Sequence, residues 1–156
     1  MCTSASAINL PYMLYFILFG VGGILTSSLT DKLGRRRSHW LFSTGHLIAQ
    51  ALILFVPSQI AHVIGFSMLG FFMAKNTLCF TYAFEFMVKD HKGCASTCLN
   101  MLDFSVCVIA GLFFLLATPR WELLCYPLFA AGAIGFVIVS LLLPESPKWL
   151  LLQGRQ

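Results

Sequence analysis

Two groups of charged residues in this sequence have the types and spacing for chemistry, and the first is the run from Asp31 to Arg37, Asp-Lys-Leu-Gly-Arg-Arg-Arg. Such a run can form ion pairs or contact anionic lipid headgroups. Gly23, Ser27 and Asp31 recur every fourth residue, so they share one helix face that a second helix can approach closely. The run predicts either a plain basic anchor or a packed loop that latches helices together. For the arginines taken singly we favour the anchor, and for Asp31 with Gly34 the latch.

The second group is Lys75 and Asp103, each inside an apolar segment. An ionisable side chain at bilayer depth is costly and is a functional candidate by default. The two segments are expected to run antiparallel, which would let these side chains pair. They either face an aqueous cavity, where they bind an ionic solute or relay a proton, or form a buried pair that holds two helices together. Of the two, we favour the structural pair.

The composition excludes several classes of protein. Mean hydropathy is +0.84, 58% of residues are hydrophobic and 10% are charged, whereas soluble domains carry about 25% charged residues. This predicts an integral, all-α membrane protein. The basic residues lie between apolar segments, which argues against a nucleic-acid interface. No catalytic triad, phosphate-binding loop or metal-ligand spacing occurs, so we expect no catalytic residue, metal or cofactor, and no enzymatic activity.

Five segments are long and apolar enough to cross a membrane, since a spanning helix needs about 20 such residues. They are about 8–29, 39–56, 60–88, 95–118 and 122–143. Prolines that should stop helices stand at positions 57, 119 and 144. The sequence therefore predicts a five-span helical bundle in a single domain over residues 1–156. Residues 144–156 are expected to form an interfacial segment.

The distribution of basic residues predicts the orientation. One side of the predicted bundle collects Lys32, Arg35, Arg36, Arg37, Lys89, Lys92, Lys148 and Arg155. The other side has Arg120, and Lys75 lies within a span. The C-terminus should therefore face the cytoplasm or the mitochondrial matrix. The predicted location is a multi-pass position in the plasma membrane or the mitochondrial inner membrane.

Three motifs occur in order at predicted helix ends, and together they resemble the major facilitator superfamily. The segment from Gly23 to Arg37 resembles the loop between its second and third helices. Tyr82-Ala83-Phe84-Glu85 followed by Lys92-Gly93 is similar to the acid-to-base motif that ends the fourth helix. The stretch from Pro144 to Leu150, Pro-Glu-Ser-Pro-Lys-Trp-Leu, looks like the signature after the sixth helix in organic cation/anion transporters and sugar porters.

This resemblance implies that the five spans are the second to sixth helices of a twelve-helix transporter, an incomplete N-terminal half. It also implies a conformational-latch motif. The motif residues are Gly23, Ser27, Asp31, Lys32, Gly34, Arg35, Arg36, Arg37, Glu85, Lys92, Glu145 and Lys148. Lys92 and Lys148 stand where the family usually has arginine. A lysine cannot form the two-pronged arginine–carboxylate contact, so the charge network should be looser here.

Two functions are compatible with these observations. The first is a half-transporter for small organic ions or sugars, which needs a partner chain or complementary half for alternating access. The second is a non-transporting accessory or scaffold subunit of a larger membrane complex, for example a mitochondrial respiratory one. A third reading is that the chain is part of a longer protein. Expected partners are the lipid bilayer, other membrane subunits and a small organic solute.

Overall fold

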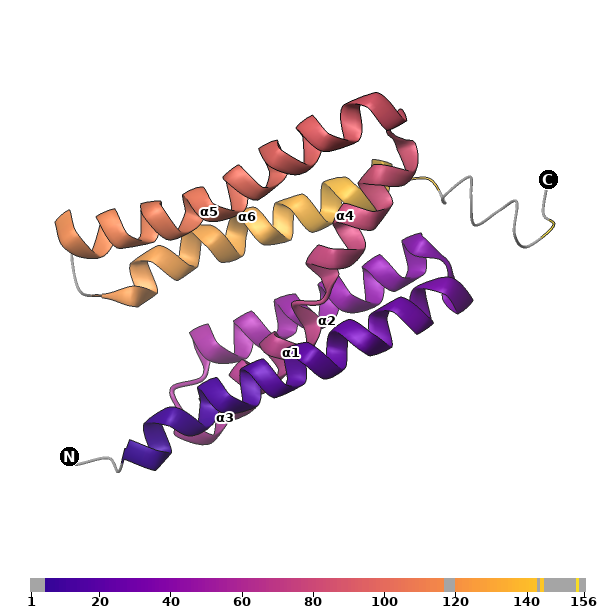
Figure 1. The fold of residues 1–156 in the computed structure, drawn as a ribbon. Coiled ribbons are helices and arrows are strands. Elements are labelled where there is room, and N and C mark those ends of the chain that lie inside the picture. Colours follow the sequence, from indigo (N-terminus) through magenta and orange to yellow (C-terminus); the bar gives the residue numbers. More distant parts are fainter. Residues whose placement is uncertain (1–4, 117–119, 143, 145–153, 155–156) are drawn as a thin grey trace.

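The computed structural model describes residues 5–116, 120–142, 144 and 154, and the regular structure in these residues is helical (Figure 1). This confirms the predicted all-α class. The helices are α1 (Ala5–Leu33), α2 (Arg35–Phe55), α3 (Gln59–Phe72), α4 (Lys75–Phe86), the short 3₁₀ helix η1 (Lys89–His91), α5 (Lys92–Leu116) and α6 (Trp121–Leu142).

The helices form two groups. Helices α1, α2 and α3 lie side by side, α5 and α6 lie together, and α4 crosses from the first group towards the second (Figure 1). Helix α2 packs against α3 on one side and α6 on the other, so it connects the groups. Helix α1 begins at the end of the bundle opposite to the end where α6 stops (Figure 1).

Four segments have the length and apolar composition of a membrane span: Asn9–Leu33, Gln59–Phe86, Lys92–Leu116 and Trp121–Leu142. The remaining predicted span, 39–56, corresponds to α2, which has 21 residues but a more polar sequence. Its buried residues include Ser38, His39, Ser43 and His46. Because these polar residues of α2 face other helices, that side of α2 does not need the apolar character of a lipid-facing surface.

The expected loop at residues 31–37 is not a loop. Helix α1 continues through Asp31 to Leu33 and α2 begins at Arg35, so Gly34 alone separates them. Gly34 has φ 92° and ψ 159°, a backbone region that glycine occupies almost exclusively. The N–H of Gly34 donates to Thr30 O (3.2 Å), and Gly34 O accepts from Ser38 N (3.2 Å). The two helices therefore join in a one-residue hinge.

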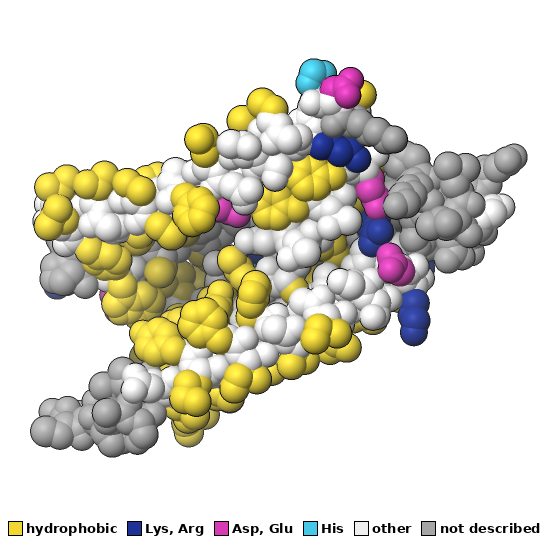
Figure 2. All heavy atoms as spheres, viewed as in Figure 1, with side chains coloured by type: hydrophobic (Ala, Val, Ile, Leu, Met, Phe, Trp, Pro, Cys, Tyr) yellow, Lys and Arg dark blue, Asp and Glu magenta, His cyan; other side chains and the backbone are white. Residues whose placement is uncertain are grey.

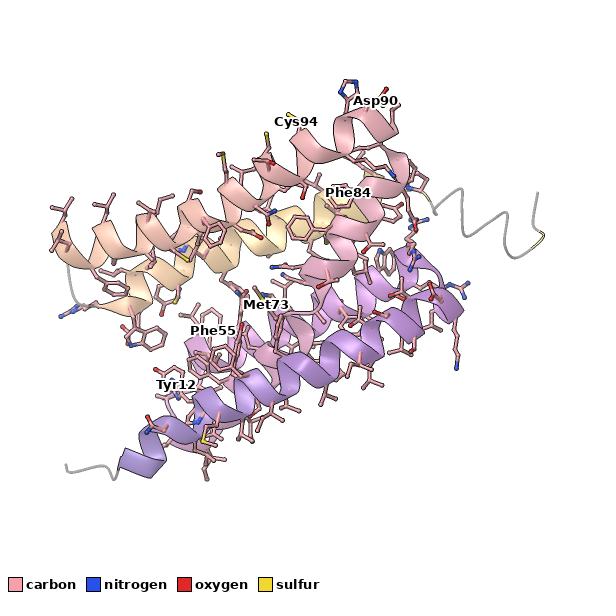
Figure 3. All side chains as sticks on the ribbon, in the orientation of Figure 1. Tyr12, Phe55, Met73, Phe84, Asp90 and Cys94 are labelled. Atoms are coloured by element: carbon pink, nitrogen blue, oxygen red, sulfur yellow. The ribbon has the colours of Figure 1, made fainter. Side chains whose placement is uncertain are left out.

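The predicted third span, residues 60–88, is broken in its middle. Helix α3 ends at Phe72 and α4 starts at Lys75. Met73 N donates to both Leu69 O and Gly70 O, and Asn76 N donates to Met73 O at 3.0 Å, which is the i to i−3 pattern of a 3₁₀ turn. Met73 lies between the two helix groups (Figure 3). Tight turns inside helices often mark functional hinges.

Helices α1 and α3 touch through their backbones. A Cβ atom added to Gly22 would collide with the carbonyl of Phe71, and one added to Gly70 would collide with the backbone of Tyr15. Thr26 and Thr30 continue the buried stripe of α1. Their hydroxyls donate to Gly22 O (2.6 Å) and Thr26 O (2.5 Å), so they are satisfied without a partner on another helix.

The outer surface is largely apolar. Charged side chains gather at one end of the molecule, while hydrophobic side chains cover its flanks (Figure 2). Helices α5 and α6 have no buried residue. At the end away from the charges, Phe55 of α2 packs on α6, with its ring centroid 5.8 Å from that of Phe129. This surface suits a lipid or protein environment.

Candidate functional site

Arg35 joins three helices at the charged end of the bundle. It is the first residue of α2, and its side chain is 15% exposed. Its Nε and Nη2 atoms donate to Oε1 of Glu85 on α4 at 3.2 and 3.1 Å. Its Nη1 atom lies 3.1 Å from Oδ1 of Asp31 on α1. A single guanidinium therefore holds two carboxylates from different helices.

The two ion pairs of Arg35 differ in their surroundings. The Glu85 side chain is 10% exposed and that of Asp31 is 73% exposed. Exposed ion pairs contribute about 0–1 kcal/mol, whereas hydrogen bonds to shielded charges are stronger. The contact with Glu85 is therefore the dominant one. The ion pair with Asp31 joins residues only four positions apart and is exposed to solvent.

Arg36 makes a second connection from the same end of α2. Its Nη2 atom lies 3.4 Å from Ser140 O in the last turn of α6, and its guanidinium carbon lies 5.6 Å from the centroid of the Trp40 ring. A cation is favourable at a helix C-terminus because the unpaired carbonyls there carry negative charge. Adjacent arginines thus reach different helices, while Arg37 and Lys32 are exposed.

Within the described part of the chain, the backbone-to-backbone approach of helices does not use the face formed by Gly23, Ser27 and Asp31. A Cβ at Gly23 would meet nothing within 4 Å, and Ser27 is exposed. The close approach expected on this face occurs one residue earlier, along the Gly22 stripe. The remaining motif residues are less informative. Lys92 is half-buried at the start of α5, and Glu145 and Lys148 lie outside the described residues.

The structure does not join Lys75 and Asp103. Lys75 is half-buried at the start of α4, and Asp103 is exposed on α5. Between described residues, the ion pairs closer than 4.0 Å are those of Arg35. Lys75 instead lines a cleft of about 210 Å³ between α2, α4 and α6, to which Asp103 does not contribute.

Several buried polar side chains belong to α2 and were not singled out as a site in the sequence. His39, Ser43 and His46 are 8%, 4% and 6% exposed. Ser43 Oγ lies within 3.4–3.5 Å of the His39 ring nitrogens, and Cys79 Sγ lies 3.6 Å from His39 Nδ1. The sequence signal for this stripe is the spacing of four and three residues along one helix face.

Metal binding finds no support in the part of the chain that the structure describes. No group of three His, Cys, Asp or Glu side chains there is close enough to hold a metal ion, and its cysteines are free thiols. The arrangement can instead hold helix ends together through charge and can present polar groups inside a helical bundle.

A helical bundle with apolar flanks, a buried polar helix and one charged end is a multi-pass integral membrane protein. Residues 4–156 match the family model described as "Sugar (and other) transporter". The chain belongs to this family, which confirms the expected sugar-porter type within the major facilitator superfamily.

Three curated relatives illustrate the similarity. The chain is 27% identical to a facilitated trehalose transporter Tret1-2 homolog of Drosophila sechellia over 139 residues, 86% of this chain and 27% of the relative. It is 29% identical to monosaccharide-sensing protein 2 of Arabidopsis thaliana over 146 residues, 88% of this chain and 20% of the relative. It is 30% identical to solute carrier family 22 member 16 of Mus musculus over 146 residues, 89% of this chain and 22% of the relative. The chain thus spans between a fifth and about a quarter of the length of these relatives.

Proposed function

We propose that this chain forms part of a transporter that moves a small organic ion or sugar by alternating access, and that it needs a partner chain or complementary half to do so. The observation that carries the proposal is the contact of Arg35 with Glu85 and Asp31 at one end of an otherwise apolar bundle. In alternating access, two helix bundles rock about a site near the bilayer midplane. Charged contacts at one end can stabilise one of the two arrangements.

Arg35 is suited to be the centre of such a latch because its partners come from two other helices. A relative shift of α4 against α2 must break the Glu85 contact, so the position of α4 and the state of the contact are coupled. The uncovered face of Gly23, Ser27 and Asp31 is where a partner helix can approach closely.

The orientation follows from the charged end. Arg35, Arg36 and Arg37 lie there with Lys32, and this concentration favours the cytoplasmic or matrix side. Helix α6 ends at the same end of the bundle (Figure 1), so the segment after it should face that compartment. The plasma membrane and the mitochondrial inner membrane are both compatible with this orientation.

One observation favours the second candidate, an accessory or scaffold subunit of a larger membrane complex. No residue of α5 or α6 is fully buried, so the sides of these helices that face away from α2 and from each other offer a large surface to other proteins. A scaffold role requires this surface and requires no solute movement.

Purification of the tagged chain from its own membranes in mild detergent, with mass spectrometry of the intact complex, separates the two candidates. The purified species is then reconstituted into liposomes and tested for uptake of labelled trehalose, glucose and a small organic cation and anion. Uptake that falls with Arg35→Met but not with Arg37→Met supports the transporter. Stable co-purification with a large multi-subunit complex, together with no uptake of any probe, overturns it in favour of the scaffold.

A further inference from the structure

The break between α3 and α4 places a helix start inside the membrane. The segment Gln59–Phe86 forms one candidate span of 28 residues, and α4 begins within it at Lys75. A helix start carries partial positive charge, although the N–H of Asn76 in the first turn of α4 already donates to Met73 O (3.0 Å). The ammonium group of Lys75 adds a full charge at the same point.

No carboxylate of the described residues forms an ion pair with Lys75, since the ion pairs between described residues are those of Arg35. Among the described residues that line the same cleft as Lys75, the ionisable side chains are those of His39 and Cys79. Neither of them supplies the fixed negative charge that a lysine at this depth requires.

We infer that the cleft between α2, α4 and α6 binds a small organic monocarboxylate, with the ligand carboxylate held by Lys75. This inference rests on the proposed transport function and names its solute class. Beside Lys75, the polar lining consists of His39, Ser43, Asn76 and Cys79. The Asn76 amide and the Ser43 hydroxyl are hydrogen-bond donors suited to the second carboxylate oxygen.

The rest of the cleft defines the body of the ligand. Its other lining residues are Leu47, Gly132, Gly135, Phe136 and Val139. These are apolar or lack a side chain, and α6 leaves space because a Cβ at Gly135 would meet nothing within 4 Å. The volume of about 210 Å³ is below the roughly 300–1,000 Å³ of pockets for drug-sized ligands. A small, compact apolar body fits best.

Charge balance favours a monoanion over a neutral sugar or a dianion. One ammonium group neutralises one carboxylate, whereas a second negative charge would remain unpaired at bilayer depth, at high cost. A neutral sugar leaves the lysine unpaired and needs several hydroxyl-binding groups, for which this largely apolar cleft offers few partners.

Calorimetric titration of the purified chain in nanodiscs of phosphatidylcholine alone tests the inference, with sodium benzoate as the probe and benzamide as its neutral counterpart. We expect saturable benzoate binding and none of benzamide. Lys75→Gln should weaken benzoate binding roughly tenfold to a hundredfold, because hydrogen bonds to charged groups contribute about 1.5–3 kcal/mol. Lys75→Arg should bind within a few-fold of the unmodified chain, because it keeps the charge.

A steric variant keeps the test independent of the lysine. Gly135→Leu fills the cleft and removes no polar group, so it should abolish benzoate binding. Gly111→Leu is its matched control on α5, since a Cβ there also meets nothing within 4 Å and Gly111 does not line the cleft. Circular dichroism and size exclusion check that each variant folds. Equal binding by Lys75→Gln and the unmodified chain, equal binding of benzamide, or no benzoate binding at all would overturn the inference.

The binding assay and the transport assay test different claims, and a negative result in one leaves the other claim standing. If the chain binds benzoate but moves no solute, alone or with its partners, the carboxylate site is supported and the proposed transport function is contradicted. If the chain moves a sugar but binds no benzoate, the proposed transport function is supported and the carboxylate site is contradicted.

Discussion

Arg35 and Glu85 are 50 residues apart in the chain, yet two nitrogens of Arg35 donate to the same oxygen of Glu85 at 3.2 and 3.1 Å. Arg35 is the first residue of α2, and Glu85 is in the last turn of α4. The contact therefore fixes the end of a broken helix against the start of the central one. Because both side chains are largely shielded, it is the strongest candidate among the described ion pairs for a switchable contact.

We expect Arg35→Met to lower the free energy of unfolding by about 1–3 kcal/mol, because it removes the two hydrogen bonds that Arg35 donates to the shielded carboxylate of Glu85. Arg37→Met is the matched control: it removes the same type of side chain two positions away, where Arg37 is exposed. Unfolding in mixed detergent micelles, followed by circular dichroism, measures the difference. Equal losses for the two variants would show that Glu85 does not depend on Arg35.

We expect Gly22→Ala and Gly70→Ala each to destabilise the chain by about 1–3 kcal/mol, because the added methyl group collides with backbone of the facing helix and not with a flexible side chain. Gly23→Ala is the control on the next residue of α1, where the methyl group meets nothing. It should be neutral or stabilising by about 0.5–1 kcal/mol, the helix preference of alanine over glycine. The same unfolding measurement applies, and a reversed order would place the α1–α3 contact on the other face.

We expect Lys75 and Asp103 to be energetically independent. The structure joins them by no ion pair, and Asp103 is exposed on α5. In a double-mutant cycle with Lys75→Met and Asp103→Asn, the effects on unfolding should add to within about 0.5 kcal/mol. A coupling well above that value would restore the sequence-based expectation of a structural pair.

The helical segments could be predicted from the sequence because long apolar runs bounded by charged residues and prolines are typical of membrane-spanning helices. Pro57 does lie between α2 and α3. The partners of Arg35 could also be predicted from the sequence, because Asp31 and Glu85 both belong to motifs that resemble those of the family. Hydropathy alone underestimates how well α2 can span a membrane, because its polar residues face inward to other helices and not to lipid.

Two other features could not be predicted, for physical reasons. Gly22 and Gly23 are equally small, and one residue rotates the helix face by about 100°, so spacing cannot select the buried one. The break at Met73 and Ala74 has no proline and no glycine at its two positions, and therefore lacks the usual sequence signals of a helix end.

We expect Cys94 to react with a membrane-impermeant maleimide from the cytoplasmic or matrix side. Cys94 is exposed near the start of α5, where it points away from the bundle (Figure 3). A variant that keeps Cys94 as its only cysteine should label in inverted vesicles or opened mitoplasts and not in sealed right-side-out membranes. A cysteine at position 120, introduced as Arg120→Cys at the other end of the bundle, is the control and should show the opposite pattern. Labelling of Cys94 from outside would reverse the proposed orientation.

We expect Gly34→Ala to lower the free energy of unfolding by about 1–3 kcal/mol, because φ 92° and ψ 159° are strained for any residue with a Cβ atom. Gly93→Ala is the control, since a Cβ there meets nothing within 4 Å and Gly93 has no positive φ. The hinge at Gly34 sets the direction in which Arg35 leaves α1, so the strain should also weaken the contact with Glu85. If Gly34→Ala is destabilising in the presence of Glu85 but much less so in a Glu85→Gln background, hinge and ion pair act as one unit. Equal costs in both backgrounds would mean that Gly34 only turns the chain, and that the latch depends on the position of α4 alone.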